Sequence, residues 1–195
     1  MKKITKILIS VLFCLVLGVS SVWADLADFP SALGVFGGMS PSANSGYGGL
    51  HYQRWFSKFG IQAEGGIFYV PASKDLNYSI VLDGLFPVYS NDFSDKLGGR
   101  VYLFGSAGHN ASTFVVPEVG EFDETYSTYK VTAPEQRYFN PTVFAAIGIG
   151  IEVVLFQHFS IPLHFGYAAD IPVNKLPGNE LYIGFTFGGG LRYRF

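Results

Sequence analysis

The chain has 195 residues and a formal net charge of −2; only 14% of its residues are charged, whereas 17% are aromatic and 24 are glycine. Soluble globular domains carry about a quarter charged residues, so this composition indicates a surface that mostly faces something other than water. The slight acidic excess argues against a nucleic-acid-binding protein, and the aperiodic glycines exclude a collagen-like chain.

Residues 1–24 have the layout of a secretory signal peptide. Lysines at positions 2, 3 and 6 precede an apolar stretch over 7–18, and a small-residue cleavage site ends at Ala24. The alternative is an uncleaved membrane anchor, because the apolar stretch approaches spanning length. Cleavage removes three of the 13 basic residues and leaves 10 against 15 acidic ones, a net charge of −5. It also removes Cys14, the single cysteine, so the predicted mature domain, 25–195, has no thiol chemistry.

The mature chain is patterned with a period of two, which predicts strands with two distinct faces. Past residue 24 no apolar run is long enough for a membrane helix. The predicted strands, in chain order, cover 32–38, 47–56, 60–70, 76–86, 98–106, 142–156, 159–169 and 181–195.

The two faces of these segments differ in a consistent way. In 142–156 the odd positions are aliphatic, whereas the even positions include Gly148, Gly150 and Glu152. In the last segment Leu191, Tyr193 and Phe195 share the apolar face. A secreted sandwich or lipocalin-like barrel would need a richly charged outer face, and these polar faces carry mainly glycine, serine, threonine and isolated charges. The apolar faces are therefore predicted to point outward, into lipid.

The connections alternate between short and long. Short turns are predicted at 57–59 and 156–158 and a moderate one at 88–97, whereas the connections near 40–46, 71–75, 109–140 and 170–180 are polar and long. A sheet can span lipid only as a closed barrel, and short turns at one end with long loops at the other are typical of one. We predict an all-β, eight-stranded antiparallel up-and-down transmembrane β-barrel with a narrow interior.

The last strand resembles the closing strand of bacterial outer-membrane β-barrels, in which a terminal Phe follows aromatic or aliphatic residues at alternate positions. Leu191, Tyr193 and Phe195 match that pattern. The layout of the mature chain is similar to the small eight-stranded families such as the OmpA membrane domain, OmpX and OmpW. The resemblance implies an outer-membrane location with both termini in the periplasm, contact with outer-membrane lipids, and assembly by the barrel-assembly machinery with periplasmic chaperones.

Several ionisable residues fall on the predicted inner faces. Buried charges must be paired, because an unpaired one costs several kcal/mol. We expect a salt-bridged layer at one level, with Arg100 near Glu152 and His164 near Arg192. It acts either as a structural plug or as a gate or proton-sensitive path. The predicted lumen network is Glu64, Asp83, Arg100, Glu152, His164 and Arg192, with His51 as a further candidate.

Aromatic residues near strand ends predict interfacial girdles. Trp55, Phe56, Phe59, Phe159, Tyr193 and Phe195 are expected on the periplasmic side, and Tyr47, Tyr69, Tyr138, Phe139 and Tyr167 on the outer side. Phe36, Phe68, Phe104 and Phe144 are candidates for an apolar upper lumen. Such a lumen favours the alternative function of a narrow channel for small or apolar solutes.

The long connection 109–140 is acidic, and its Val, Phe and Tyr content predicts a strand-like extension above the membrane. Loops on rigid scaffolds often carry binding, so we predict contact with an extracellular ligand or host surface; the alternative is a solvated charge cluster that repels neighbouring polyanions. The segment lacks a D-x-D-x-D-G motif, and we expect no metal or cofactor. The candidate contact residues are Glu118, Glu121, Asp123, Glu124 and Lys130.

A catalytic function is a further alternative, because the lipid A palmitoyltransferase family consists of small barrels that are enzymes, with a His, Asp and Ser at the extracellular rim. His109, Ser112 and Asp123 lie in the corresponding region. The chain has no nucleophile elbow and no HExxH spacing. We therefore expect a non-enzymatic protein with a structural, envelope or surface-interaction role.

Overall fold

The computed structural model describes residues 29–39, 46–69, 76–116, 118–123, 128–174 and 180–195. The predicted signal peptide lies outside these residues. Within them, no helix is long and apolar enough to cross a membrane. The strands are β1 (Ser31–Met39), β2 (Gly46–Trp55), β3 (Gly60–Tyr69), β4 (Leu76–Ser94), β5 (Leu97–Val116), β6 (Val119–Asp123), β7 (Thr128–Ala133), β8 (Gln136–Leu155), β9 (Phe159–Pro172) and β10 (Tyr182–Arg194).

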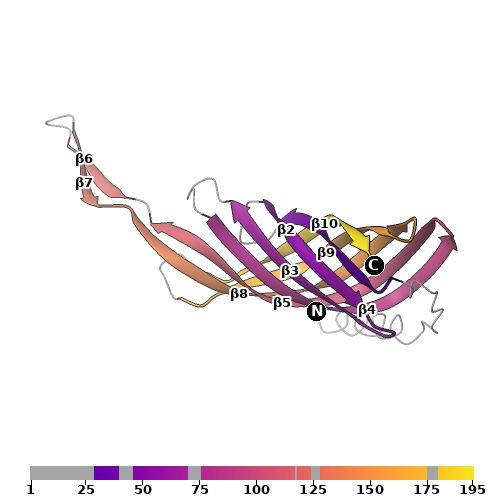
Figure 1. Ribbon diagram of the computed structural model, residues 1–195. Coiled ribbons are helices and arrows are strands. Elements are labelled where there is room, and N and C mark those ends of the chain that lie inside the picture. The colour runs from indigo at the N-terminus through magenta and orange to yellow at the C-terminus, as the bar shows by residue number, and fades with distance from the viewer. Residues whose placement is uncertain (1–28, 40–45, 70–75, 117, 124–127, 175–179) are drawn as a thin grey trace, which may run out of the picture.

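Eight of these strands close into a barrel in the order β1-β10-β9-β8-β5-β4-β3-β2, and all neighbours are antiparallel (Figure 1). β6 and β7 form a separate two-stranded ribbon. The predicted eight-stranded antiparallel barrel is confirmed. Closure pairs the strands all round and so removes the free sheet edges that an open sheet would present. We call the end with the start of β1, the end of β10 and the short turns the turn end, and the opposite end the loop end.

The strands are staggered around the barrel. A row of paired residues that leaves β10 at Arg192 passes through Gly34, His51 and Glu64 and on through β4, β5, β8 and β9. It returns to β10 at Tyr182, ten positions nearer the loop end. Such an offset tilts the strands against the barrel axis. Residues equally far from their strand ends therefore lie at different heights in the lumen.

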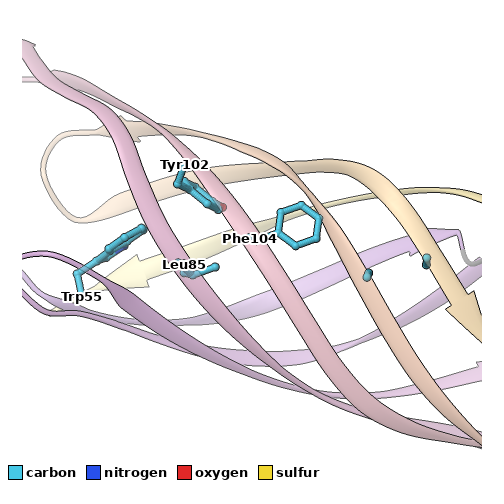
Figure 2. Packing of buried hydrophobic residues seen from close by; sticks show 6 residues of the cluster. Trp55, Leu85, Tyr102 and Phe104 are labelled. Carbon is cyan, nitrogen blue, oxygen red and sulfur yellow. The ribbon is translucent and has the colours of Figure 1, made fainter. Parts of the chain in front are cut away.

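The side chains alternate between outward-facing and lumenal positions as predicted. In β8, Ile147, Ile149 and Ile151 are exposed, whereas Gly150 and Glu152 are buried. A contiguous apolar exterior of this kind is rare on a water-soluble monomer. The buried apolar residues lie inside the barrel, where Trp55, Leu85, Tyr102 and Phe104 point into the interior (Figure 2).

Glycines make room for the large side chains in the narrow bore. A Cβ added at Gly150 would lie 2.1 Å from the Tyr102 ring, and one added at Gly60 would lie 2.7 Å from the Trp55 ring. Both distances are far inside van der Waals contact. Glycine at these two lumenal positions is therefore required by packing against an aromatic ring on another strand.

Three strands are longer than the sequence pattern predicted. The moderate turn predicted at 88–97 is wrong, because β4 continues to Ser94 and pairs with β5 down to Leu97, with two register shifts on the way. β5 and β8 also extend past their predicted limits to pair up to Val116 and Gln136. Polar residues interrupt the hydrophobic alternation in these extensions, but their Val, Phe and Tyr residues still favour strand pairing.

The girdle assignment is wrong for two residues. Trp55 is only 8% exposed and packs inside the barrel, with its ring centroid 5.5 Å from that of Tyr102. Tyr47 lines a lumenal cavity. Both occupy inward positions of β2, on the same face of the strand as His51. The side chain of Tyr69 lies outside the described part. The remaining girdle residues are exposed: Phe56, Phe59, Phe159, Tyr193 and Phe195 on strands or turns at the turn end, and Tyr138, Phe139 and Tyr167 toward the loop end.

Candidate functional site

A buried charge cluster crosses the lumen near the turn end. The Arg192 guanidinium donates from Nη1 to Oε1 of Glu152 at 3.4 Å, and Nη1 of Arg100 donates to Oε2 of the same carboxylate at 3.3 Å. Arg100 also lies over the Trp55 ring, 4.0 Å from its centroid. The register explains the contact between Arg100 and Glu152, since the two residues are direct partners across β5 and β8. We call Arg100, Glu152 and Arg192 the charge cluster.

Arg192 extends the charge cluster to the opposite wall. Its Nε donates to Nε2 of His51 at 3.0 Å, and its Nη2 donates to Oε1 of Gln62. Each of the three guanidinium nitrogens of Arg192 therefore has an acceptor on a different strand. Arg192 and Glu152 are each only 1% exposed. The lumen is therefore closed near the turn end by side chains that are bonded to one another.

Gln62 links the charge cluster to two further carboxylates. Its amide nitrogen donates to Oδ2 of Asp83 at 2.9 Å and to Oε1 of Glu64 at 2.5 Å, and its oxygen also accepts from Nε2 of Gln53 at 3.4 Å. Gln62 is neutral, and it is absent from the predicted lumen network. Its position on the same face of β3 as Glu64 was the available signal.

His164, which was predicted to lie near Arg192, is not its partner in the register of β9 and β10. Arg192 is paired with Ser160 across β9 and β10, and His164 is paired with Gly188, which lies nearer the loop end. Nε2 of His164 instead shares a hydrogen bond with Oη of Tyr102 at 2.7 Å, and its ring stacks on Phe104 at 4.9 Å. The side chains of the predicted network were expected at one level of the lumen. They lie at two levels instead, because the barrel is staggered.

Arg194 cross-links the turn end, and it is absent from the residues predicted to form a site. Its guanidinium donates to the carbonyl oxygens of Gln157 at 2.9 Å and Phe29 at 3.1 Å. The backbone of Phe195 bonds to Ser31, at 2.8 Å and 3.1 Å for the two directions. Inward arginines thus alternate with outward apolar residues in β10. The predicted assembly residues Leu191, Tyr193 and Phe195 are all about half exposed on the outer face of the barrel, at 51%, 50% and 53%.

A cavity of about 50 Å³ lies on the loop side of the charge cluster. Glu64 and Asp83 form part of its wall, and Phe104, Phe144 and His164 form another part. Toward the loop end, Ser79 donates to Oδ1 of Asn110 at 2.6 Å, and Nδ2 of Asn110 donates to Asp170 at 2.8 Å.

Of the other aromatics predicted in the upper lumen, Phe36 stacks on His51 with ring centroids 5.4 Å apart and meets Tyr47 edge-on at 5.5 Å. The side chain of Phe68 lies outside the described part.

A hairpin extends beyond the loop end of the barrel. β5 and β8 pair as far as Val116 and Gln136, whereas β4 accompanies β5 only to Ala111 and β9 accompanies β8 only from Thr142. β6 and β7 continue the projection (Figure 1). We call residues 112–141 the loop-end hairpin.

The candidate contact residues lie on this hairpin. Glu121 is paired with Lys130 and Asp123 with Thr128 in the backbone register of β6 and β7, and Glu118 is exposed just before them. The side chains of Glu121, Asp123 and Lys130, and all of Glu124, lie outside the described part. Their role in contact stays a prediction.

The proposed catalytic residues are not brought into a testable arrangement. His109 is exposed on β5 and stacks on Tyr78, with ring centroids 5.9 Å apart. The side chains of Ser112 and Asp123 lie outside the described part, so the catalytic alternative gains no support. Among the described residues, no three His, Cys, Asp or Glu side chains are grouped so as to hold a metal ion.

No protein-family model matches the chain, and no curated protein sequence matches it. Solved structures do match its fold. The N-terminal β-barrel domain of Pseudomonas aeruginosa OprF is 11% identical with a TM-score of 0.50, over 85% of this chain and 96% of that one. Outer membrane protein H (OprH) of P. aeruginosa is 12% identical with a TM-score of 0.50, over 85% of this chain and 99% of that one. The chain has the fold of the small eight-stranded outer-membrane β-barrels.

Proposed function

We propose that the protein is an integral barrel of a bacterial outer membrane that presents the loop-end hairpin to an extracellular ligand or host surface. Residues 1–24 are removed on export, the turn end and both termini face the periplasm, and residues 25–195 form the single barrel domain. The observation that carries the proposal is the paired hairpin, which projects past every other strand of the barrel (Figure 1).

The exterior supports the membrane location. Lipid-facing positions along the strands carry large exposed apolar side chains such as Ile147 at 72%, Ile183 at 69% and Leu50 at 62%. Burying such surface in water-free surroundings contributes about 25 cal/mol per Å². Aromatic residues at both ends of this belt fit membrane–water interfaces, and outer-membrane lipids are then direct partners of the barrel wall.

The lumen supports a structural role for the barrel itself. Arg100, Glu152 and Arg192 are each less than a tenth exposed and bonded across the bore. A plug of this kind favours a structural role over a channel function. In this proposal the barrel is a rigid scaffold, and the hairpin contacts the ligand or host surface. We expect a planar bilayer containing the protein to show no steady conductance steps; nanosiemens-scale steps would favour the channel alternative.

The hairpin is tested by a deletion that preserves the register. Val116 and Gln136 are direct partners, so residues 117–135 can be replaced by Asn-Gly, the preferred two-residue hairpin turn. We expect bacteria displaying this variant to lose adhesion to immobilised host cells or matrix, with the barrel still folded on a detergent gel.

A matched control neutralises the acidic side chains without shortening the hairpin, as Glu118→Gln, Glu121→Gln and Asp123→Asn together. Loss of adhesion in this control as well assigns the contact to charge, and retained adhesion assigns it to the shape of the hairpin. Undiminished adhesion by the deletion variant would refute a contact function of the hairpin.

A further inference from the structure

We propose that Arg194 holds the barrel closed at the junction between its first and last strands. We call this junction, the pairing of β1 with β10, the seam. The inference goes beyond the surface role, because it concerns how the barrel stays shut and not what the hairpin contacts. It rests on the weakness of the seam, on the bonds that Arg194 makes there, and on the turn that supplies one of those bonds.

The seam differs from every other junction of the barrel in its covalent connection. All other neighbouring strands of the barrel are joined by a turn, a loop or the loop-end hairpin. The seam instead brings together distant residues, and Phe29 and Arg194 are 165 positions apart. Joining distant segments costs more conformational entropy than closing a short turn. Since no short connection keeps β1 near β10 once their pairing is lost, the seam is where the barrel opens most readily.

The pairing at the seam is also short and poor in side chains. It has eight register pairs among the described residues, against 20 between β5 and β8. Glycine occupies one or both positions in four of the eight pairs. Cross-strand side-chain contacts are the main source of sheet stabilisation, and glycine has no side chain to contribute. Three of the glycine pairs are consecutive, namely Phe36 with Gly190, Gly37 with Gly189 and Gly38 with Gly188.

Arg194 supports the seam at its turn end. The guanidinium, at the end of β10, donates to the carbonyl oxygen of Phe29, just before β1, at 3.1 Å. The same guanidinium donates to the carbonyl oxygen of Gln157, in the turn between β8 and β9, at 2.9 Å. Arg194 is only 3% exposed, so water competes little for these bonds. One side chain thus connects the chain ahead of β1, the end of β10 and a neighbouring turn.

The turn between β8 and β9 packs against both sides of the seam. The ring centroid of His158 lies 4.4 Å from that of Phe29 and 5.6 Å from that of Tyr193. Phe156 and Gln157, in the same turn, have φ angles of 51° and 63°, a left-handed conformation in which non-glycine residues are uncommon. Such a conformation persists only where surrounding contacts hold it, and the hydrogen-bonded carbonyl of Gln157 is one such contact.

The first test compares the unfolding rates of variants folded in lipid vesicles. Arg194→Met keeps the apolar stem and removes the guanidinium donors, so we expect unfolding about tenfold faster, the loss of one charged hydrogen bond. The control is Arg54→Met, because Arg54 lies at the same end of the barrel and is exposed. Its unfolding rate should change less than about twofold. An unchanged rate in Arg194→Met would overturn the proposal.

Engineered disulfides distinguish the seam from the barrel as a whole. The chain has one cysteine, so Cys14→Ser gives a background without thiols. Val35 and Leu191 are direct partners across the seam, and Val153 and Ile161 are direct partners across β8 and β9. All four are exposed on the outer face. Opposed residues of antiparallel strands lie about 4.5–5.5 Å apart at Cα, which is within the span of a disulfide.

The seam disulfide, Val35→Cys with Leu191→Cys, should abolish the effect of Arg194→Met on the unfolding rate. The control disulfide, Val153→Cys with Ile161→Cys, should leave that effect in place. Restoration by both disulfides alike would show that Arg194 supports the barrel in general. Restoration by neither would show that Arg194 does not act on the seam, and either result refutes the proposal.

A milder variant keeps the proposal testable if Arg194→Met does not fold. Arg194→Lys keeps the charge but loses the planar fork that reaches two acceptors at once. Amide hydrogen exchange in detergent micelles reports local opening. We expect exchange about tenfold faster in β1 and β10 and nearly unchanged in β4 and β5. A uniform increase, or none, would contradict the proposal. None of these outcomes depends on the hairpin, so failure here leaves the surface proposal intact.

Discussion

The two halves of the lumen are built differently. On the turn side, Arg100, Glu152 and Arg192 neutralise one another across the bore and bond directly. On the loop side, Glu64 and Asp83 share one neutral amide and border a cavity. The first half is thus cross-linked by charge, whereas the second holds its acidic groups through a neutral amide. The comparison teaches that the same narrow barrel can pair its buried polar groups by direct ion pairs at one level and by a shared amide at the next.

The largest expected effect comes from breaking the turn-side half. Glu152→Ala leaves two buried guanidinium groups without their shared carboxylate, which should destabilise the barrel by about 3–5 kcal/mol. Denaturant unfolding of the protein in lipid vesicles measures this. The control is Glu135→Ala, which removes the exposed partner of Arg137 and should cost less than about 1 kcal/mol. Equal losses in the two variants would show that the cluster is not a stabilising cross-link.

The second effect concerns the link between the halves. Gln62→Leu removes both donors to Glu64 and Asp83 and the acceptor of Arg192, so we expect a loss of about 2–3 kcal/mol. Gln53→Leu is the matched control, since Gln53 makes a single longer bond of 3.4 Å to Gln62, and its cost should be under about 1.5 kcal/mol. If Gln53→Leu proves the more damaging, Gln62 is not the link.

A third prediction tests the packing of the turn-side half. Gly150→Ala places a methyl group 2.1 Å from the Tyr102 ring, and overpacking of this kind costs about 1–3 kcal/mol. Combination with Tyr102→Leu should recover part of that loss. A double variant whose losses merely add would show that the two positions do not contact.

Outside the lumen the expected effect is smallest. Replacing 117–135 by Asn-Gly removes a projection none of whose described residues belongs to the charge cluster or lines the cavity. We expect the free energy of unfolding to change by less than about 0.5 kcal/mol, as for other substitutions away from buried features. A loss as large as that of Glu152→Ala would show that the hairpin supports the barrel.

The fold was predictable because the two faces of each strand differ in composition. Outward residues such as Ile147 and Tyr193 are apolar and inward ones are small or polar, so parity alone located the eight strands and the inner face. Strand length was not predictable in 87–94, where the alternation fades although pairing continues. The Val, Phe and Tyr content of 109–140 did predict the strand-like extension that β5 and β8 form.

The site was predictable only in part. Arg100 and Glu152 were paired correctly because β5 and β8 are neighbours in the barrel and the two residues are direct partners in their register. His164 and Arg192 are offset by four positions in the register of β9 and β10, and counting along the sequence did not reveal this offset. Trp55 was taken for an interfacial residue because bulk and position near a strand end do not reveal parity in a glycine-rich strand. Gln62 was overlooked because the search followed charge.

The measurement that tests the central claim most directly is surface proteolysis of intact cells, followed by a detergent gel with and without heating. We predict a barrel that migrates faster unheated than heated and is cut only within 117–135. A chain that stays soluble without detergent, shows no heat-dependent migration, or is cut at the turn end and not in the hairpin would contradict the account.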